Sequence, residues 1–394
     1  MSEGRISRQL RTELDELQPL MRFFDDSAWS KRQHEPGICD FVAGNPHEPP
    51  LPELVESLRS ATVPRSDTWF AYPMSEPDAR ETVSGAIRER LGMQIPPDDV
   101  LMTTGAFGAF AALFPAIADP GDEVVYLKPP WFFYASMIRM AGATPVGVSL
   151  EPPAFDLDPD AIASVLTERT RAVLINTPQN PTGRIYAEQE LDRLAGVLTE
   201  RSERNGRPVY LVSDEAYRHI RYDDRPFVSP TSRYPSSFMV YTYGKTLLAP
   251  GERIGYIAFP PGLSGKEELR DAIKLSQMSG GWLFPNTVLQ HALPETDRYS
   301  IDIKHLEAKR DRMVDALRGM GYELQVPEGT FYLLPKAPIS DDLRFTEMLA
   351  EHDVFVLPGA LVDLPGYFRV SLTASEEMIE RSLAGFEAAR RAAT

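Results

Sequence analysis

Between about residues 98 and 245, short apolar runs alternate with segments of helical character. The apolar runs have the length of β-strands and end at turn-forming or polar residues; they lie within 99–105, 122–133, 171–178, 208–217 and 237–244. Segments that separate the runs, such as 187–204, have a helical pattern. Because strands that alternate with helices are typical of βαβ units, this stretch predicts a largely parallel sheet covered by helices on both faces.

The chain is long enough for more than this one core. At about 150 residues per domain, its 394 residues predict two to three domains or one large two-part protein. Beyond residue 300, a helical pattern over 303–321, several short apolar runs and a final helix over 375–391 indicate a second α+β unit. We predict an α/β protein with a large domain over 61–295, a smaller α+β domain over 296–394, and an N-terminal segment 1–60 that joins the small domain.

The N-terminal segment begins with an amphipathic pattern. Within residues 5–25, leucines recur close to helical spacing with charged residues between them; they are Leu10, Leu14, Leu17 and Leu20. This spacing predicts a helix that packs its apolar side on the protein's own core.

The overall charge and the cysteine content exclude several classes of protein. The formal net charge is −16, whereas affinity for nucleic acid or an anionic membrane needs clustered positive charge. A single cysteine, Cys39, rules out an intramolecular disulfide and a cysteine-rich metal site, and it favours a reducing compartment. Neither a secretory signal nor a run of roughly 18 apolar residues is present. We therefore expect a cytoplasmic protein without metal, nucleic-acid or membrane partners.

Polar and glycine residues cluster where the predicted strands end. In open α/β sheets the chemistry gathers at the carboxyl ends of the strands. The residues at these ends are Gly105, Trp131, Asn180, Asp214 and Lys245. We therefore expect their side chains to meet in one site.

Lys245 follows directly on an apolar strand, and Arg253 comes eight positions later. Desolvation favours the neutral, nucleophilic form of an amine, which is what a Schiff base with an aldehyde requires. Gly105 opens a helix after a strand, where free backbone N–H groups and the helix dipole bind phosphate. Arg253 and the hydroxyl of Thr242 would complete such a phosphate site.

Asp214 and Asn180 add two further polar groups. A buried carboxylate at the end of a strand needs a cationic partner, and a protonated pyridine nitrogen is one such partner. Asn180 opens the turn NPTG, which leaves its amide free to hydrogen-bond a ligand.

Together these segments resemble the class I/II aminotransferases among the fold-type I pyridoxal-phosphate enzymes. The resemblance runs from VAGNPHEPPLP to FRVSL, nearly the whole chain, and rests on TTGAFGA, PPWFFY, NTPQNPTG, SDEAY, YGKTLLAPGERIGY, GTFYLLP and FRVSL. Their joint occurrence is far more specific than any one motif. The resemblance implies pyridoxal 5'-phosphate as cofactor and an amino acid and a 2-oxo acid as substrates.

The resemblance also implies a role for each matching residue. Lys245 would form the Schiff base with the cofactor and later move the proton at the substrate Cα. Asp214 would keep the ring nitrogen protonated, which makes the ring an electron sink. Asn180 and Tyr217 would bind the ring's 3' oxygen, and Trp131 would stack on the ring. The phosphate site would consist of Gly105, Ala106, Phe107, Thr242 and Arg253.

Substrate binding and assembly follow from the same resemblance. Arg369 would grip the substrate α-carboxylate through two hydrogen bonds, Asn180 would border that site, and Gly44 would contact the carboxylate through its backbone. The family forms homodimers whose sites lie at the subunit interface. Phe70 stands where a tyrosine often reaches the neighbouring phosphate, and Ser75 replaces a usual glycine. Tyr72 could substitute for that tyrosine if the segment is extended, since alternate residues then share a face.

Several alternatives remain open at this point. A pyridoxal-phosphate-dependent lyase or amino-acid oxidase could use the same residues, because these reactions diverge only after the carbanion forms. A transcriptional regulator is disfavoured, since only about forty residues precede VAGNP and they show no DNA-binding pattern. A nicotinamide-dependent dehydrogenase is disfavoured because no G-x-G-x-x-G links a strand to a helix.

The identity of the substrate is indicated only by bulky apolar residues. Candidates for the pocket wall are Trp282, Phe284, Phe331 and Tyr332. No second arginine for a side-chain carboxylate can be identified. We therefore predict an L-amino donor with an aromatic or large apolar side chain.

Overall fold

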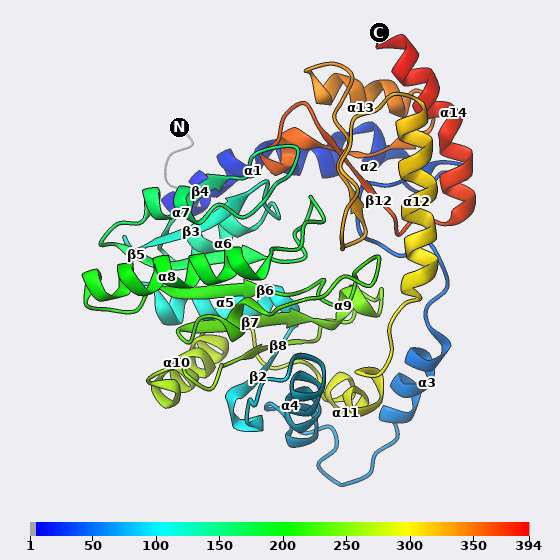
Figure 1. Ribbon diagram of the computed structural model, residues 1–394. Coiled ribbons are helices and arrows are strands. Elements are labelled where there is room, and N and C mark those ends of the chain that lie inside the picture. Colours follow the sequence, from blue (N-terminus) through cyan, green and yellow to red (C-terminus); the bar gives the residue numbers. More distant parts are fainter. Residues whose placement is uncertain (1–4, 394) are drawn as a thin grey trace.

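The computed structural model describes residues 5–393, and its centre is a seven-stranded sheet (Figure 1). The strand order is β2-β8-β7-β6-β5-β3-β4. The strands are β2 (Val100–Thr103), β3 (Glu123–Lys128), β4 (Thr144–Ser149), β5 (Thr170–Asn176), β6 (Tyr210–Asp214), β7 (Ser237–Thr242) and β8 (Gly255–Ala258). Only β8 runs against its neighbours, since it pairs antiparallel with both β7 and β2. The predicted α/β fold with a mostly parallel sheet is confirmed.

Consecutive residues of the central strands face opposite sides of the sheet, and helices cover both sides. Val124 belongs to the apolar cluster that includes residues of α5 (Gly105–Ile117), α6 (Tyr134–Met140) and α10 (Lys266–Ser279). Val125 packs instead with α7 (Pro159–Val165) and α8 (Glu188–Asn205). Where β2, β7 and β8 lie, the second side is covered by α4 (Pro77–Leu91) and α11 (Thr287–Thr296). Double-sided burial explains why these strands are apolar runs without alternation.

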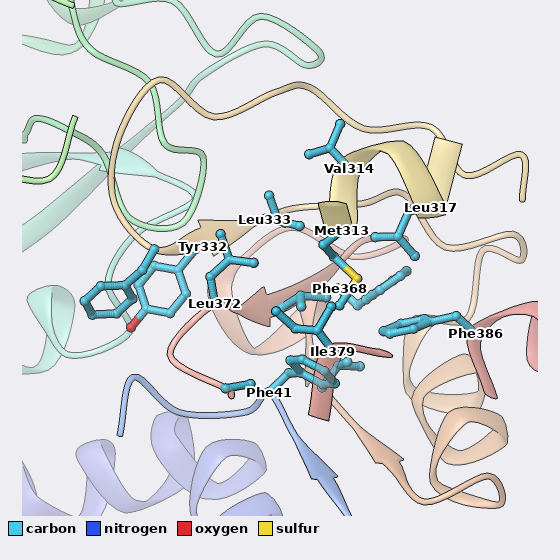
Figure 2. Packing of buried hydrophobic residues seen from close by; sticks show 14 of the residues in the cluster. Phe41, Met313, Val314, Leu317, Tyr332, Leu333, Phe368, Leu372, Ile379 and Phe386 are labelled. Carbon is cyan, nitrogen blue, oxygen red and sulfur yellow. The ribbon is translucent and has the colours of Figure 1, made fainter. Parts of the chain in front are cut away.

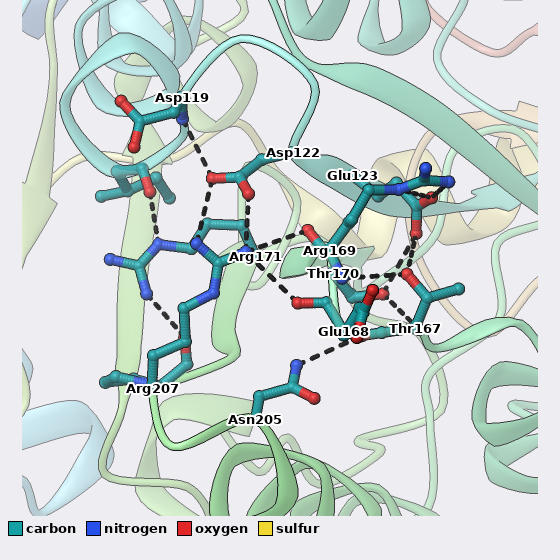
Figure 3. Close-up of polar contacts among 12 residues, drawn as sticks. Asp119, Asp122, Glu123, Thr167, Glu168, Arg169, Thr170, Arg171, Asn205 and Arg207 are labelled. Carbon is teal, nitrogen blue, oxygen red and sulfur yellow. Dashed lines mark hydrogen bonds and ion pairs between the residues drawn. The ribbon is translucent and has the colours of Figure 1, made fainter.

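Ion pairs tie together the amino ends of the strands (Figure 3). Glu123 at the start of β3 accepts from Nη2 of Arg169 at 2.6 Å. Asp122 accepts from Nη2 of Arg207 at 2.6 Å. This network lies at the end of the sheet opposite to the residues that follow the strands, so the carboxyl ends are left for the site.

The C-terminal part of the chain builds a second layer around two small sheets. One contains β9 (Tyr332–Leu333), β11 (Leu357–Pro358) and β12 (Phe368–Ser371), and the other pairs β1 (Cys39–Asp40) with β10 (Val354–Phe355). The surrounding helices are α12 (Ile303–Gly319), α13 (Asp342–Ala350) and α14 (Glu376–Ala392). Figure 2 shows the apolar cluster that joins them, in which Phe41 from the N-terminal segment packs with Phe368 and Phe386.

The N-terminal segment divides its contacts between both parts of the molecule. Helix α1 (Arg8–Asp26) lies against α6, because Arg139 Nε donates to Glu13 at 2.5 Å. Strand β1 pairs with β10, and α2 (Ala28–Arg32) packs near α13. Helix α3 (Pro52–Ala61) packs on α11, one of the helices that cover the large sheet.

The predicted domain boundaries at 60/61 and 295/296 stay a prediction. Three short 3₁₀ turns complete the structure: η1 (Pro97–Asp99), η2 (Pro230–Ser232) and η3 (Gly359–Val362).

Helix α1 differs from the prediction in the side that it buries. Leu10 and Leu14 are 45% and 51% exposed, whereas Leu20 is buried. Glu13 is buried as well, through its ion pair with Arg139. The expectation that the leucine side packs on the protein's own core therefore holds only near the end of the helix, because a buried ion pair fixes its rotation.

Candidate active site

A cavity of about 630 Å³ lies at the carboxyl ends of the central strands. Of the residues predicted for the site, those that line it are Gly44, Ala106, Phe107, Trp131, Asn180, Asp214, Tyr217, Thr242, Lys245, Arg253 and Arg369. Gly105 adjoins the cavity, since a Cβ on it would lie 3.0 Å from Arg253 Nη2. The fold thus brings the predicted residues together, from segments as far apart as residues 44 and 369.

Lys245 lies on the one-turn helix α9 (Tyr243–Thr246), directly after β7. Its Nζ lies 5.8 Å from the ring centroids of both Tyr217 and Phe331. It is the only lysine among the described residues that line the cavity. The end of β7 therefore places one primary amine against aromatic rings inside the cavity.

Asp214 is the last residue of β6 and is buried. The backbone N–H of Ala216 donates to its Oδ1 at 3.1 Å, and the hydroxyl of Tyr134 donates to its Oδ2 at 2.5 Å. Burial raises the pKa of Asp214 to about 6, although both hydrogen bonds act in the opposite direction. Within residues 5–393 no cationic side chain forms an ion pair with this carboxylate, although the nearby charge of Lys245 also lowers its pKa. The site therefore offers a buried acid that a cationic ligand group would keep ionised.

Arg369 on β12 is buried and points its guanidinium at Asn180. Its Nη1 donates to Asn180 Oδ1 at 3.2 Å, and its Nη2 donates to the carbonyl of Val42 at 2.9 Å. Its Nε has no hydrogen-bond partner among the described residues, and none of their carboxylates pairs with it. The guanidinium also lies over the ring of Tyr332, 4.1 Å from the centroid. A buried arginine in this state is suited to bind an anion from a ligand.

Gly105, Thr242 and Arg253 form a narrow cradle at the start of α5. A Cβ on Gly105 would lie 3.0 Å from Arg253 Nη2 and 3.3 Å from Thr242 Oγ1. Gly105 has a φ of +71°, a conformation that glycine adopts without strain. Arg253 donates to the carbonyl of Pro250 at 2.8 Å and forms no ion pair within residues 5–393, and burial lowers its pKa. Free backbone N–H groups of α5 and this guanidinium can together hold a phosphate.

Gly44, Tyr217 and Trp131 complete the set that the sequence predicted. A Cβ on Gly44 would lie 2.7 Å from the hydroxyl of Tyr332, so only glycine fits there without displacing that residue. Tyr217 is buried, and its burial raises the pKa of its hydroxyl well above the ordinary value. Trp131 meets the ring of Phe107 edge-on at 4.5 Å.

Several residues that line the cavity were not predicted from the sequence, among them Tyr134, Asn176 and Phe24. Tyr134 holds Asp214, Asn176 donates through Nδ2 to the Asp214 carbonyl at 2.9 Å, and Phe24 enters from α1. Asn176 ends β5 as Asp214 ends β6, so the rule of strand ends could have found it. Nothing in the local pattern around Phe24 or Tyr134 indicates that these side chains turn towards the cavity.

The predicted pocket wall is confirmed only in part. Trp282 and Tyr332 line the cavity, and Phe132 does so without having been predicted. Phe284 and Phe331 are buried and are not lining residues; Phe331 belongs to the apolar cluster around the small sheets.

Phe70 and Tyr72 lie outside the lining set and are 58% and 98% exposed. The segment before them turns, because Ala71 N donates to the Thr68 carbonyl at 2.9 Å. The extended conformation that would place both residues on one face is therefore absent at Phe70. Ser75 has a structural contact, since its Oγ accepts from Met102 N at 2.9 Å.

No helix within residues 5–393 combines the length and the apolar character that crossing a bilayer demands. No group of three or more His, Cys, Asp or Glu side chains in that range is arranged to hold a metal ion.

A sequence model of the family "Aminotransferase class I and II" matches residues 37–386. The chain belongs to the class I and II aminotransferases. Among the relatives of this aminotransferase is the aspartate/prephenate aminotransferase of Thermus thermophilus. The two sequences are 33% identical over 361 aligned residues, which cover 88% of this chain and 90% of the relative. The aspartate aminotransferase of Thermotoga maritima is 29% identical over 88% of this chain and 89% of the relative.

Solved structures agree with this family. An aminotransferase from Eubacterium rectale superposes with a TM-score of 0.90 at 26% identity and covers 99% of both chains. An engineered Thermus thermophilus aspartate aminotransferase complexed with tryptophan has a TM-score of 0.84 at 29% identity, covering 98% of this chain and 99% of that one.

The cavity fits pyridoxal 5'-phosphate, the cofactor of this aminotransferase family. The cofactor presents a phosphate, a ring nitrogen that can carry a proton, and an aldehyde. The cradle around Gly105 suits the phosphate, the buried carboxylate of Asp214 suits the protonated nitrogen, and Lys245 places a primary amine in the cavity that suits the aldehyde. The protein is accordingly a pyridoxal-phosphate-dependent aminotransferase.

Proposed function

We propose that this aminotransferase moves the amino group of an L-amino acid with an aromatic or large apolar side chain to a 2-oxo acid. The single observation that carries the substrate class is the aromatic wall of the cavity. Besides Trp131, Tyr134 and Tyr217, the wall includes Phe24, Phe107, Phe132, Trp282 and Tyr332. Aromatic rings offer a large apolar contact area to a ligand side chain.

The cavity's positive charges support the same substrate class. The cationic side chains that line it are Lys245, Arg253 and Arg369. Arg253 is assigned to the cofactor phosphate, Lys245 to the aldehyde carbon, and Arg369 to the substrate α-carboxylate. Among the lining residues of the described chain, none is left to pair with a carboxylate on the substrate side chain.

In the proposed reaction, the bound cofactor supplies the carbonyl carbon that accepts the amino group and an electron sink for the substrate Cα. Lys245 would hold the aldehyde carbon and, once released, its Nζ would take the proton from the donor Cα and deliver it to that carbon, with the reverse transfer when the 2-oxo acid is aminated. Asp214 would hold the proton on the ring nitrogen. Tyr217 and Asn180 would hydrogen-bond the 3' oxygen of the ring, and Trp131 would stack on the ring. Gly105, Ala106, Phe107, Thr242 and Arg253 would hold the phosphate.

Arg369 orients the substrate in this proposal. Its unpartnered Nε and its Nη groups lie beside Asn180 and the Val42 carbonyl, where an α-carboxylate would replace weak contacts with charged hydrogen bonds. The backbone of Gly44 borders the same carboxylate. Fixing the carboxylate fixes the position of Cα relative to Lys245.

We further propose a homodimer. Exposed apolar side chains gather on α1, on the segment 63–74 and on the segment 275–283; they are Leu10, Leu14, Met21, Val63, Phe70, Tyr72, Met74, Leu275, Met278, Trp282 and Leu283. Phe70 or Tyr72 would lie near the neighbouring subunit's site. A cytoplasmic location stays a prediction from the sequence.

Two alternatives are worth testing beside this proposal. The relatives are named for aspartate and prephenate, which favours aspartate as a second candidate donor. A lyase or an amino-acid oxidase on the same residues differs in the fate of the amino group, which it releases as ammonia.

The deciding experiment is an anaerobic titration of the cofactor-loaded enzyme with phenylalanine, tyrosine, leucine, alanine and aspartate, followed by absorbance. Conversion of the cofactor to its pyridoxamine form by the aromatic and large apolar donors supports the proposal. Conversion by aspartate alone contradicts the substrate class. Release of ammonia with the original spectrum restored contradicts transamination.

A further inference from the structure

One residue of the cavity comes from outside the two layers that build the rest of it. Phe24 is in the last turn of α1 and lines the cavity together with Phe132, which follows β3. We infer that Phe24 is a specificity-determining residue that forms, with Phe132, the wall against which the side chain of the amino donor packs. This inference deepens the proposed function and rests on it.

The ring of Phe24 is held by aromatic neighbours. It meets Trp29 at a centroid distance of 5.5 Å and 78°, and Phe132 at 6.3 Å and 61°. Phe23 lies 5.7 Å away at 85°. These edge-on contacts fix the ring before a substrate enters, so binding does not require the wall to become ordered.

The helix that carries Phe24 is itself fastened to the wall of the site. Glu13 is 5% exposed and accepts from Nε of Arg139 at 2.5 Å. Gln9 Nε2 donates to the Arg139 carbonyl at 2.8 Å. Arg139 belongs to α6, the helix that begins two residues after Phe132. Glu13 therefore acts as a positioning residue that sets α1, and with it Phe24, against the segment 131–134.

Phe132 also lies between the cavity and a group of charged residues beside α1. Phe132 lines both the cavity and a smaller, polar hollow of about 310 Å³ beside α1. In that hollow Lys128 Nζ pairs with Asp363 at 3.0 Å. Lys128 is thus already paired with a carboxylate, and it lines this hollow and not the cavity. A substrate carboxylate against Phe24 would be desolvated without a partner, which favours an apolar side chain.

The test compares Phe24→Ala with Leu20→Ala in the cofactor-loaded enzyme. Leu20 is a buried residue of the same helix that does not line the cavity, so its substitution also loosens α1 but leaves the wall in place. The measured quantity is the ratio of kcat/KM for L-phenylalanine to that for L-alanine. We expect the ratio to fall about tenfold in Phe24→Ala, the size typical for lost apolar contacts in a binding pocket, and to stay within about twofold of wild type in Leu20→Ala.

A binding measurement separates this inference from the proposed function. The dissociation constant of 3-phenylpropionate, which cannot react, should rise about tenfold in Phe24→Ala. Phe24→Leu keeps α1 packed and should give an intermediate value for both quantities. Equal losses for both amino donors, or the same ratio in Phe24→Ala and Leu20→Ala, would overturn the inference. If the wild type converts only aspartate and binds 3-phenylpropionate no better than Phe24→Ala does, both the proposed function and this inference are contradicted. If the wild type and Phe24→Ala prefer phenylalanine over alanine by the same ratio, only the inference about Phe24 is contradicted.

Discussion

Tyr134 donates a hydrogen bond of 2.5 Å to Oδ2 of Asp214, a residue 80 positions later in the chain. Both side chains are buried. Burial raises the pKa of Asp214 to about 6, and the hydrogen bond from Tyr134 is the largest effect that opposes this rise. Tyr134 therefore keeps the carboxylate ionised at a lower pH than burial alone would allow.

Tyr134→Phe should raise the pKa of Asp214 above 6. A hydrogen bond to a charged group contributes roughly 1.5–3 kcal/mol, which corresponds to a rise of about one to two pKa units. Since only the ionised carboxylate holds a protonated ring nitrogen, the affinity for pyridoxal phosphate should begin to fall at a higher pH. The measurement is the dissociation constant of the cofactor between pH 5 and 8.

A matched control for this substitution is Tyr186→Phe. The hydroxyl of Tyr186 is buried without a hydrogen-bond partner among the described residues, and its ring packs outside the cavity. Its removal should leave the pH profile unchanged. A profile for Tyr134→Phe that matches the wild type would show that the 2.5 Å contact does not tune Asp214.

Asp214→Asn should stabilise the cofactor-free protein at high pH. The folded-state pKa of about 6 exceeds the ordinary 3.8, so the ionised carboxylate destabilises the fold above pH 6. This penalty amounts to about 3 kcal/mol for a shift of about two units, and it disappears as the pH falls from 6 towards 4. Urea unfolding without cofactor should therefore show the variant more stable than wild type at pH 8, with a smaller difference at pH 5. With saturating pyridoxal phosphate the order should reverse, because the wild-type carboxylate then has its cationic partner.

The site residues that could be predicted from the sequence are those that stand at the carboxyl end of a strand. Asp214 and Lys245 follow apolar runs directly, and the parallel sheet brings such ends to one edge. The antiparallel direction of β8 could not be predicted from the residues at the ends of the strands. It pairs antiparallel with β7 because the short connection through α9 returns the chain beside the strand that it has just left.

Phe24 could not be predicted from the sequence for a different reason. The leucine spacing of α1 predicts that Leu10 and Leu14 face inward, yet both are exposed. The rotation of this helix is set by Glu13 and its ion pair with Arg139, 126 positions away. A contact between partners so distant leaves no local pattern, so the side chain that α1 presents to the cavity could be found only in the folded structure.

Lys245→Ala should prevent covalent fixation of the cofactor. Borohydride reduction of the cofactor-loaded wild type should leave pyridoxal phosphate attached to the chain after denaturation and dialysis, because Lys245 is the only lysine among the described cavity-lining residues. The variant should release it. Lys128→Ala is the control, since Lys128 is paired with Asp363 outside the cavity and should not affect fixation. Attachment that persists in Lys245→Ala, confirmed as folded by circular dichroism, would contradict the assignment.

Gly105→Ala should weaken cofactor binding beyond its effect on stability. Gly105 has a φ of +71°, and its new Cβ would lie 3.0 Å from Arg253 Nη2. Gly92→Ala provides the control, because Gly92 has a φ of +69° with nothing within 4 Å of the Cβ position. Both variants should lose roughly 1–2 kcal/mol of stability through backbone strain. Only Gly105→Ala should bind pyridoxal phosphate about tenfold more weakly, since displacing Arg253 removes a hydrogen bond to the phosphate worth roughly 1.5–3 kcal/mol. Equal cofactor affinities for the two variants would show that the cradle does not hold the phosphate.

Arg369→Lys should separate the role of charge from the role of geometry in substrate binding. Lysine keeps the positive charge but cannot donate the two parallel hydrogen bonds that a guanidinium offers a carboxylate. Losing a buried, charged hydrogen bond of this kind costs roughly 2–3 kcal/mol, so kcat/KM for the amino donor should fall about 100-fold and 3-phenylpropionate should bind correspondingly more weakly. Arg381→Lys is the control, because Arg381 donates to the Ile38 carbonyl at 3.0 Å and does not line the cavity. If Arg369→Lys retained wild-type affinity for 3-phenylpropionate, the α-carboxylate would have to bind elsewhere. The unpartnered Nε of Arg369 would then lack the ligand that its burial requires.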